Sequence, residues 1–283
     1  MTWVIRRHVD AAAFLAHAEN WLLRAEAEHN LLLGIARAVA AGRTDHQPPV
    51  YFATIERNGE IAGCAYRTPP FKLGLTRLPH EAIPSLVADV ARTYESLPAV
   101  LGPETETRAF AELWADEHRI HWRPGMRQRI YQLVRVIPPT SPPPGEFLVA
   151  RPEHADLVAT WIGEFSREAG VTEIRARTIA EDRIADGALF LWDVGEPVSL
   201  AGWSARSPNG VRVGPVYTPP AQRGNGYASA VTAAASQRAL DRGMRFCFLY
   251  TDLANPTSNS IYLRIGYTPV CDVMDWVFEP ARR

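Results

Sequence analysis

The sequence is short of cysteine, of long apolar runs and of net charge, and each shortage removes a class of protein. Its three cysteines, Cys64, Cys247 and Cys271, are odd in number and widely spaced, so neither a disulfide framework nor a zinc site is expected. No stretch reaches the roughly 18 apolar residues of a membrane span. The segment Met1–Arg7 lacks the apolar core of a secretory signal. We therefore expect a cytoplasmic protein with reduced cysteines and no membrane partner.

Charge is almost balanced, with 30 basic and 31 acidic residues and a formal net charge of -1. A protein whose main task is to neutralise a phosphate backbone carries a basic excess, so we expect no nucleic-acid partner. The closest histidine pair is His118 and His121. Two ligands are too few for a metal site, so no metal is expected.

A proline-rich stretch divides the 283 residues into two parts of nearly equal length. Five prolines fall within Pro138–Gly145, and such a run continues neither a helix nor a central strand. The expected organisation is a first domain over 1–137, a linker over 138–145 and a second domain over 146–283. Both parts show a similar order of expected strands and helices, which indicates a degenerate tandem duplication.

The expected fold class is α+β or α/β, with a mixed, mostly antiparallel sheet in each domain and helices on both of its faces. In the first domain the pattern predicts a helix over Ala11–Ala27, a hairpin at Asn58-Gly59 and a strand over Arg129–Val136. In the second domain it predicts a helix from about Gly224 to Arg242 and a last strand over Tyr267–Phe278.

The most informative segment is the loop that leads into the alanine-rich helix. Gly224 and Gly226 lie where the helix opens, so its unpaired N–H groups can wrap a phosphate oxygen without obstruction by side chains. One alternative is that the glycines only form a turn. A dinucleotide site is a weaker alternative, because Ser229 replaces the third glycine, two prolines lengthen the loop, and about 30 residues follow Asp252.

This segment resembles the acyl-CoA signature of the GNAT superfamily of N-acyltransferases, Arg/Gln-x-x-Gly-x-Gly/Ala. Arg223, Gly226 and Ala228 meet the signature. A second resemblance follows about 30 residues later, in the run from Asn255 through Tyr262 to Gly266-Tyr267. The resemblance covers Phe147–Phe278. It implies a sheet splayed between its fourth and fifth strands, a bulge at Gly214-Pro215, and acetyl-CoA as co-substrate in the wedge.

The resemblance also implies roles for individual residues. The strand after the bulge would lie along the pantetheine arm and acyl group, with Val216, Tyr217 and Thr218. The cofactor pyrophosphate would lie on the backbone of Arg223, Gly224, Asn225, Gly226, Tyr227, Ala228 and Ser229. Asn255 would bond a pantetheine amide, although Asn before Pro is equally a good helix cap. Tyr262 would face the sulfur, and its alternative is core packing.

For catalysis, the N–H of Tyr217 is the expected oxyanion donor and the Tyr262 hydroxyl the expected acid for the departing thiolate. The general base stays open among Glu164, Glu168, Glu173 and Asp252. In the first domain the corresponding loop, Thr76–Glu81, has no glycine, so it should not hold pyrophosphate.

The expected function is therefore N-acetyl transfer to a primary amine of a small molecule or peptide, by a monomer or homodimer. A non-catalytic acyl-CoA-binding module is the alternative of a different class.

Overall fold

The computed structural model describes residues 2–42, 46–170 and 175–279. They form two compact units, and both are discontinuous in sequence. Unit 1 consists of Met1–Ile130, Tyr250–Ala254 and Val270–Arg283, and unit 2 of Tyr131–Leu249 and Asn255–Pro269. No helix of the described residues is long and apolar enough to cross a membrane. Cys64, Cys247 and Cys271 all have free thiols.

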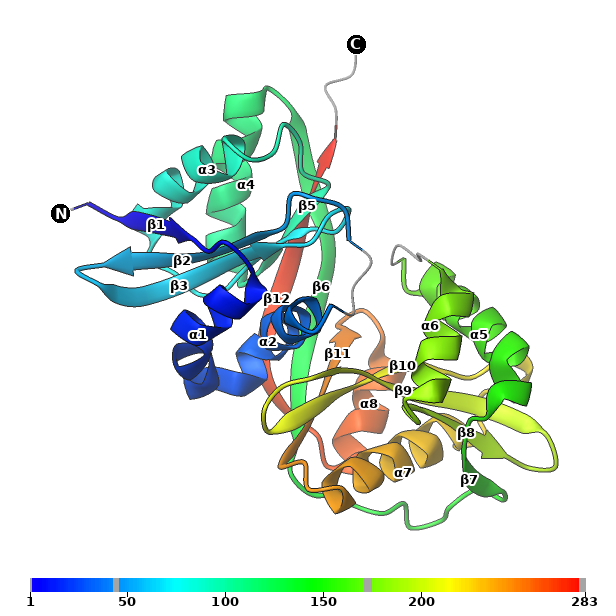
Figure 1. Ribbon diagram of the computed structural model, residues 1–283. Coiled ribbons are helices and arrows are strands. Elements are labelled where there is room, and N and C mark those ends of the chain that lie inside the picture. The colour runs from blue at the N-terminus through cyan, green and yellow to red at the C-terminus, as the bar shows by residue number, and fades with distance from the viewer. Residues whose placement is uncertain (1, 43–45, 171–174, 280–283) are drawn as a thin grey trace. The chain divides into compact units, whose positions relative to one another are not determined.

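Unit 1 contains a sheet with helices on both faces (Figure 1). The elements up to its boundary with unit 2 are β1 (Val4–Arg7), α1 (Ala11–Leu22), α2 (Glu26–Ala40), β2 (Tyr51–Arg57), β3 (Glu60–Arg67), β4 (Leu73–Leu75), α3 (Ile83–Ala91), β5 (Ala99–Gly102), α4 (Glu104–His118) and β6 (His121–Leu133). The strand order is β1-β2-β3-β4-β5-β12. Strands β4 and β5 are parallel, and the other neighbours pair antiparallel.

The alternation of side chains along β2 separates two cores in unit 1. Phe52 packs with α1 and α2 on one face of the sheet, whereas Tyr51, Ala53 and Ile55 pack with α3 and α4 on the other. The β2–β3 hairpin turns at Asn58 and Gly59, whose φ angles of 55° and 80° suit a two-residue turn. The hairpin prediction is confirmed. The predicted helix over Ala11–Ala27 was wrong in extent, because a 3₁₀ turn over Leu23–Ala25 separates α1 from α2.

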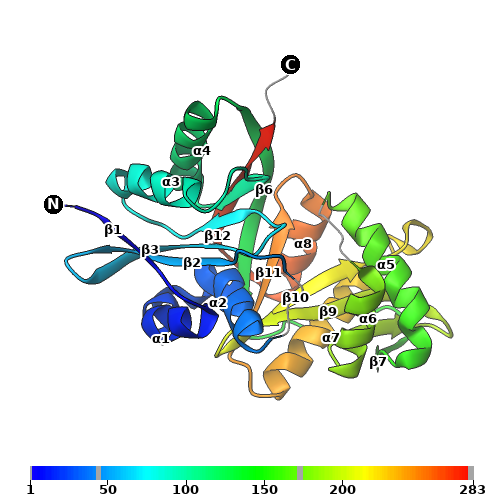
Figure 2. The same ribbon diagram turned by 45° about the horizontal axis from the view of Figure 1, so that its top comes forward.

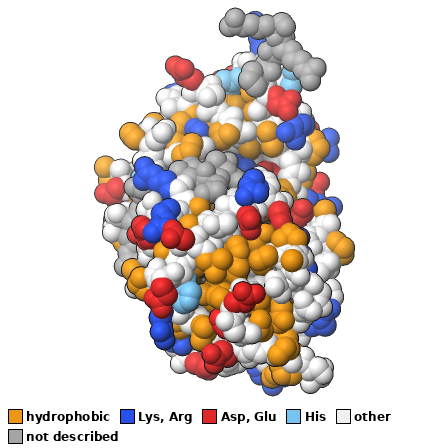
Figure 3. All heavy atoms as spheres, turned by 90° about the vertical axis from the view of Figure 1, so that its right-hand side faces the viewer, with side chains coloured by type: hydrophobic (Ala, Val, Ile, Leu, Met, Phe, Trp, Pro, Cys, Tyr) orange, Lys and Arg blue, Asp and Glu red, His pale blue; other side chains and the backbone are white. Residues whose placement is uncertain are grey.

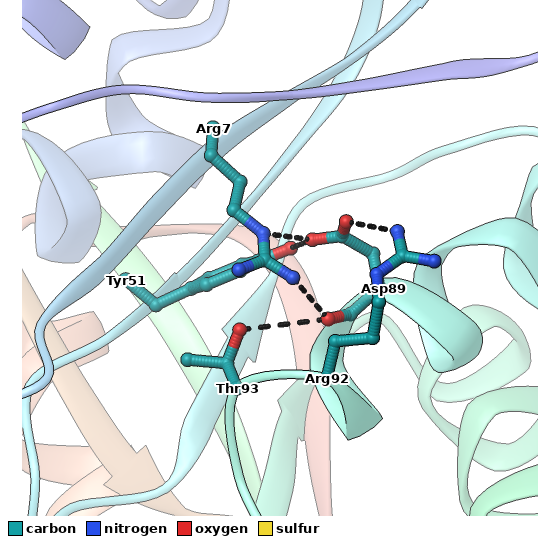
Figure 4. Close-up of polar contacts among 5 residues, drawn as sticks. All are labelled: Arg7, Tyr51, Asp89, Arg92 and Thr93. Carbon is teal, nitrogen blue, oxygen red and sulfur yellow. Dashed lines mark hydrogen bonds and ion pairs between the residues drawn. The ribbon is translucent and has the colours of Figure 1, made fainter.

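A buried carboxylate fastens β1 to α3 in unit 1 (Figure 4). Asp89 is 4% exposed and accepts hydrogen bonds from Arg7 Nε at 2.6 Å, the Tyr51 hydroxyl at 2.8 Å and Arg92 Nη2 at 2.7 Å. Burial alone would raise the pKa of Asp89, yet the bonds from these three donors outweigh it and hold that pKa below its usual value. The network is fully satisfied at its carboxylate, which is the condition for a buried charge to stabilise a fold.

Unit 2 repeats the arrangement (Figure 2). Its elements are β7 (Glu146–Val149), α5 (Ala155–Glu168), α6 (Ala176–Ala185), β8 (Leu189–Asp193), β9 (Pro197–Arg206), β10 (Gly210–Tyr217), α7 (Tyr227–Asp241), β11 (Phe246–Asp252), α8 (Pro256–Ile265) and β12 (Thr268–Glu279). The strand order is β6-β11-β10-β9-β8-β7. Helices α5 and α6 cover one face through a core with Leu189, Leu191 and Leu200. Helices α7 and α8 cover the other through a core with Phe190 and Trp203.

The two halves of the sequence share one order of elements, from β1 to β6 in the first half and from β7 to β12 in the second. In each, a strand leads to two helices, a three-strand meander, a helix after the fourth strand, a parallel fifth strand, a further helix and a last strand. The predicted fold class, a tandem pair of mixed and mostly antiparallel sheets with helices on both faces, is confirmed.

The boundary between the units differs from the expected one. The last strand, β12, starts in unit 2, but from Val270 onward it belongs to unit 1, where it pairs with β5 from Met274↔Gly102 to Val277↔Ala99. The proline-rich segment 138–145 contains no helix or strand, as expected, and belongs to unit 2. Strand β6 begins at His121, eight residues before the predicted strand. Pro124-Gly125 interrupts the hydrophobic pattern in this part of the strand. Gly125 lies against β12, since a Cβ on it would be 2.6 Å from the Asp275 carboxylate.

The surface carries charge of both signs. On the face shown in Figure 3, basic and acidic side chains are interspersed around a gathering of hydrophobic ones. Among the side chains coloured there, no large area of a single sign is seen, in keeping with a net charge of -1. This face therefore lacks the basic stripe of a nucleic-acid-binding surface.

Candidate functional site

Strands β10 and β11 are paired only along the first part of β10 and separate beyond it. Their parallel register runs from Gly210↔Phe246 to Arg212↔Phe248, and β10 then continues to Tyr217. On its other edge β10 stays paired with β9, with register shifts on both sides of Val213. Gly214 lies in the second shift at a φ of 150°, and Pro215 has no N–H to donate. The predicted bulge and the predicted splay between the fourth and fifth strands are both present.

The loop after β10 ends in an open helix N-terminus. Gly224 and Gly226 have φ angles of 85° and 84°, a region that favours glycine. A Cβ on Gly224 would meet nothing within 4 Å. The first helical bond runs from the Ala230 N–H to Gly226 O at 3.0 Å. Within the described residues, no acceptor takes a hydrogen bond from the N–H groups of the three residues before it, Tyr227, Ala228 and Ser229. These donors, at the positive end of a 15-residue helix, form a site suited to an anion.

Arg223 connects this loop to β10 and α5. Its Nη2 donates to both carboxylate oxygens of Glu168 on α5, at 2.8 and 2.7 Å, and its Nε donates to Thr218 O at 2.9 Å. Its guanidinium carbon also lies 5.7 Å from the centre of the Tyr217 ring. The guanidinium is thus engaged by protein groups that fix the loop to β10 and α5. Direct contact of Arg223 with a phosphate stays a prediction.

The end of β10 alternates between the two cores of unit 2. The Tyr217 side chain is buried beside Trp161 of α5, with ring centres 6.4 Å apart, while Val216 packs against the core under α7. Ser199 donates to Tyr217 O at 3.1 Å and exchanges a hydrogen bond with the Thr218 hydroxyl at 2.8 Å. The side chains of Tyr217 and Thr218 are therefore engaged by protein groups, whereas Val216 is only partly buried.

One of the four carboxylates considered as a base lies beside Tyr217. Burial, a hydrogen bond to Glu164 and the charges of Glu164 and Glu168 raise the pKa of Tyr217 to about 12. Glu168 is neutralised by Arg223. Asp252 belongs to unit 1, where it accepts a hydrogen bond from the Ala254 N–H at 2.8 Å. Glu173 lies outside the described residues.

Asn255 and Tyr262 are the two expected site residues on α8. The Asn255 side chain accepts from the Ser258 N–H at 3.0 Å and Pro256 follows at the helix start, so the helix-cap interpretation is confirmed. The amide group of Asn255 can still donate. Tyr262 is 8% exposed and packs between Tyr131 and Tyr267, at ring-centre distances of 6.4 and 5.9 Å.

The hydroxyl of Tyr262 is chemically distinctive. No described residue makes a hydrogen bond to it, in contrast to Tyr131 and Tyr267, whose hydroxyls bond Asn259 at 3.0 Å and Ser236 at 2.8 Å. Burial raises the pKa of Tyr262 to about 12. The hydroxyl is thus protonated at neutral pH and has a donor to offer.

In the described segment of unit 1 that corresponds to it, the open helix start after Gly226 has no counterpart. Arg77 and Leu78 of this segment pack directly against Gly63. A Cβ on Gly63 would lie 2.6 Å from Leu78 Cβ. At the start of α3 the Ile83 N–H bonds His80 O, and a proline occupies the first turn. Among the described residues, no group of three His, Cys, Asp or Glu side chains could hold a metal ion.

Comparisons with known proteins agree with this geometry. Residues 192–277 match the family model described as FR47-like protein. A search of the curated proteins found no significant match. A GCN5-related N-acetyltransferase from Sphaerobacter thermophilus is 16% identical, with 99% of this chain and 96% of that chain covered and a TM-score of 0.65.

Two further solved structures span the whole chain. A Drosophila protein is 12% identical at a TM-score of 0.72, with 99% and 100% of the two chains covered. A tandem GNAT protein from the clavulanic acid biosynthesis pathway is 11% identical at a TM-score of 0.55, with 100% and 99% covered. At such identities the likeness concerns the fold.

Proposed function

Because the chain carries the GNAT fold in tandem, we propose that unit 2 is an N-acetyltransferase that moves an acetyl group from acetyl-CoA to a primary amine of a small molecule or peptide. The observation that carries the proposal is the pairing of two features: the splay of β10 from β11, and the open N-terminus of α7 beside it. A splay alone offers space, and a helix N-terminus alone offers a weak anion site. Together they suit a long ligand with a pyrophosphate at one end.

The residues of the loop fit such a ligand. The N–H groups of Tyr227, Ala228 and Ser229 have no protein acceptor in the described chain, and glycines at 224 and 226 keep side chains away from them. The carboxylate nearest to the loop, Glu168, is neutralised by Arg223. The same reasoning excludes unit 1 from this role, since its corresponding helix starts with a proline in the first turn.

In the proposed reaction, the protein contributes the backbone of β10 and the carboxylate of Glu164. The backbone of β10 from Val216 to Thr218 would lie along the acyl group, with the Tyr217 N–H as donor to the oxyanion. Bound acetyl-CoA supplies an activated thioester. Glu164, the carboxylate beside Tyr217 that no described cation neutralises, is the base that we assign to the amine.

Tyr262 would stabilise the departing sulfur. A phenol with a pKa of about 12 is a weaker acid than a thiol, whose pKa is ordinarily about 8.5. Complete proton transfer to the thiolate is therefore uphill, and the hydroxyl acts mainly by donating a hydrogen bond to the developing charge. The free hydroxyl of Tyr262 favours catalysis over the alternative, an acyl-CoA-binding module without turnover.

Release of free thiol from acetyl-CoA over a panel of primary amines tests the proposal. We expect turnover that depends on both the amine and the protein. Self-acetylation gives little background, because the chain has a single lysine, Lys72, whose ammonium pairs with Asp275. Thermal stabilisation by acetyl-CoA without turnover on any amine would support the binding module. Stabilisation by NAD instead of acetyl-CoA would overturn both.

A further inference from the structure

A cavity lies in unit 2 at the far end of α7 from the loop Arg223–Gly226. It has a volume of about 320 Å³ and is lined by Trp203, Arg206, Val211, Ala239, Arg242 and Met244. The 15 residues of α7 place its two ends roughly 22 Å apart at about 1.5 Å per residue. The cavity is therefore separate from the site described above, and its volume falls at the lower end of the roughly 300–1,000 Å³ of small-molecule pockets.

The cavity combines an apolar wall with two cations. Trp203 is 5% exposed and its indole N–H donates to Ala235 O at 3.2 Å, so the ring is fixed in place. The guanidinium carbons of Arg206 and Arg242 lie 5.8 and 5.5 Å from the centre of this one ring. Both arginines are exposed, and they come from different elements, the end of β9 and the C-terminal cap of α7.

No carboxylate neutralises these charges in the described part of the chain. Neither Arg206 nor Arg242 forms an ion pair there, and the acid nearest in sequence, Asp241, accepts a hydrogen bond from Gln237 at 2.8 Å. A cation at a helix C-terminus is favourable in itself, which accounts for Arg242. It does not account for Arg206, which ends a strand and shares the same ring. Two like charges over one indole repel each other unless an anion joins them.

We propose that this cavity binds a small organic anion with a flat apolar body and one carboxylate or phosphate group. The apolar body would lie on the indole between Val211 and Met244, and the anionic group would reach the two guanidinium forks. Arginine forks match the oxygen geometry of both groups, with two parallel N–H···O bonds each. The proposal does not depend on acyl transfer, because the cavity shares no residue with the phosphate loop or with Tyr262.

Three probes test the proposal: benzoate, phenyl phosphate and the neutral isostere benzamide. The readout is the indole N–H signal of Trp203 in ¹H–¹⁵N spectra, identified among the eight tryptophans by its loss in Trp203→Phe. We expect benzoate or phenyl phosphate to shift this signal saturably below about 10 mM, the more strongly for the preferred anionic group, and benzamide to leave it in place. Equal binding of benzamide, or no saturable shift from either anion, overturns the proposal.

Three arginine variants test whether the recognition is local. Arg206→Gln and Arg242→Gln should each weaken binding of the anion by roughly tenfold or more. The matched control is Arg245→Gln, because Arg245 is also exposed and stands over an aromatic ring, Phe246 at 5.3 Å, but does not line the cavity. The control should bind within about twofold of wild type, as expected for an exposed, screened charge that does not line the cavity.

An equal loss in all three variants would mean that the anion responds to general positive charge, and the proposal would fail. Arg242→Gln can also weaken the end of α7. In that case Arg206→Gln decides alone, since Arg206 lies on a strand, and unchanged affinity in a folded Arg206→Gln protein is contrary to the proposal.

Discussion

Placing a carboxylate at Ser229 would separate the stability of α7 from its capacity to bind an anion. Ser229 is the third residue of the helix, where an acidic side chain interacts favourably with the helix dipole by about 0.3–1 kcal/mol. The same carboxylate would lie near any anion that the free N–H groups hold. Ser229→Asp should therefore keep or raise the melting temperature while it weakens coenzyme A. The two effects have opposite signs, so a binding loss cannot be ascribed to unfolding.

The magnitude follows from the exposure of the loop. Two unit charges about 4 Å apart repel by about 1 kcal/mol in water and about 4 kcal/mol at the effective dielectric constant of a protein surface. The loop glycines are exposed, so the low end applies, and a loss of about 1 kcal/mol, or roughly fivefold in Kd, is expected. Ser229→Asn is the matched neutral control and should change Kd by less than about threefold, since it keeps the N–H donors.

Isothermal titration of coenzyme A into wild type, Ser229→Asp and Ser229→Asn at two salt concentrations provides the measurement. The gap between Asp and Asn should narrow at high salt, because screening acts on exposed charges. Equal affinities of the two folded variants would show that α7 does not receive the anion. Gly226→Asp would be a less clear test of anion binding than Ser229→Asp. The φ of 84° at Gly226 would add backbone strain of about 1–2 kcal/mol to the electrostatic effect.

Three further predictions concern other residues. Tyr262→Phe should lower kcat by about 10–100-fold while the Kd for acetyl-CoA stays the same, because the hydroxyl acts mainly in the transition state; a kcat within about twofold of wild type excludes that role. Arg223→Gln and Glu168→Gln should weaken coenzyme A by similar small factors and change stability by under about 1 kcal/mol each, as for an exposed pair. A loss confined to Arg223→Gln would indicate direct contact with phosphate instead. Asp89→Asn should remove stability present at neutral pH. Because the pKa of Asp89 is depressed in the folded state, wild type should lose this stability as pH falls below about 4. The urea midpoint of the variant should therefore change less with pH in this range than the midpoint of wild type.

Local chemistry made the open helix start at Gly224–Gly226 and the bulge at Gly214-Pro215 predictable from the sequence. Gly224 and Gly226 permit positive φ angles that other residues rarely adopt, and Pro215 has no N–H to donate, so these local features could be inferred without the fold. The contacts of Glu164 and Glu168 could not be inferred, because both lie on α5 and only tertiary packing brings one to Tyr217 and the other to Arg223.

The partner of β12 was equally beyond sequence reasoning. Strand pairing depends on which edge is open when the chain arrives, and a pattern of alternating residues does not identify the edge. The expected domain boundary therefore followed the proline-rich segment, whereas Val270 and later residues belong to unit 1.

The pairing of β12 with β5 affects the order in which the two units can be completed during synthesis. Ribosomes release the N-terminal part of a chain first, and a self-contained domain can fold as soon as it has emerged. Unit 1 cannot do so, because the strand that pairs with Ala99–Gly102 follows β7 to β11 in the sequence and is synthesised after them. Unit 1 is therefore completed only after these strands of unit 2 have been made, and until then the edge of β5 is exposed to wrong pairing. Cleavage of the chain after Pro269 would detach the part of β12 that belongs to unit 1, and so damage the unit formed mainly by residues before Tyr131.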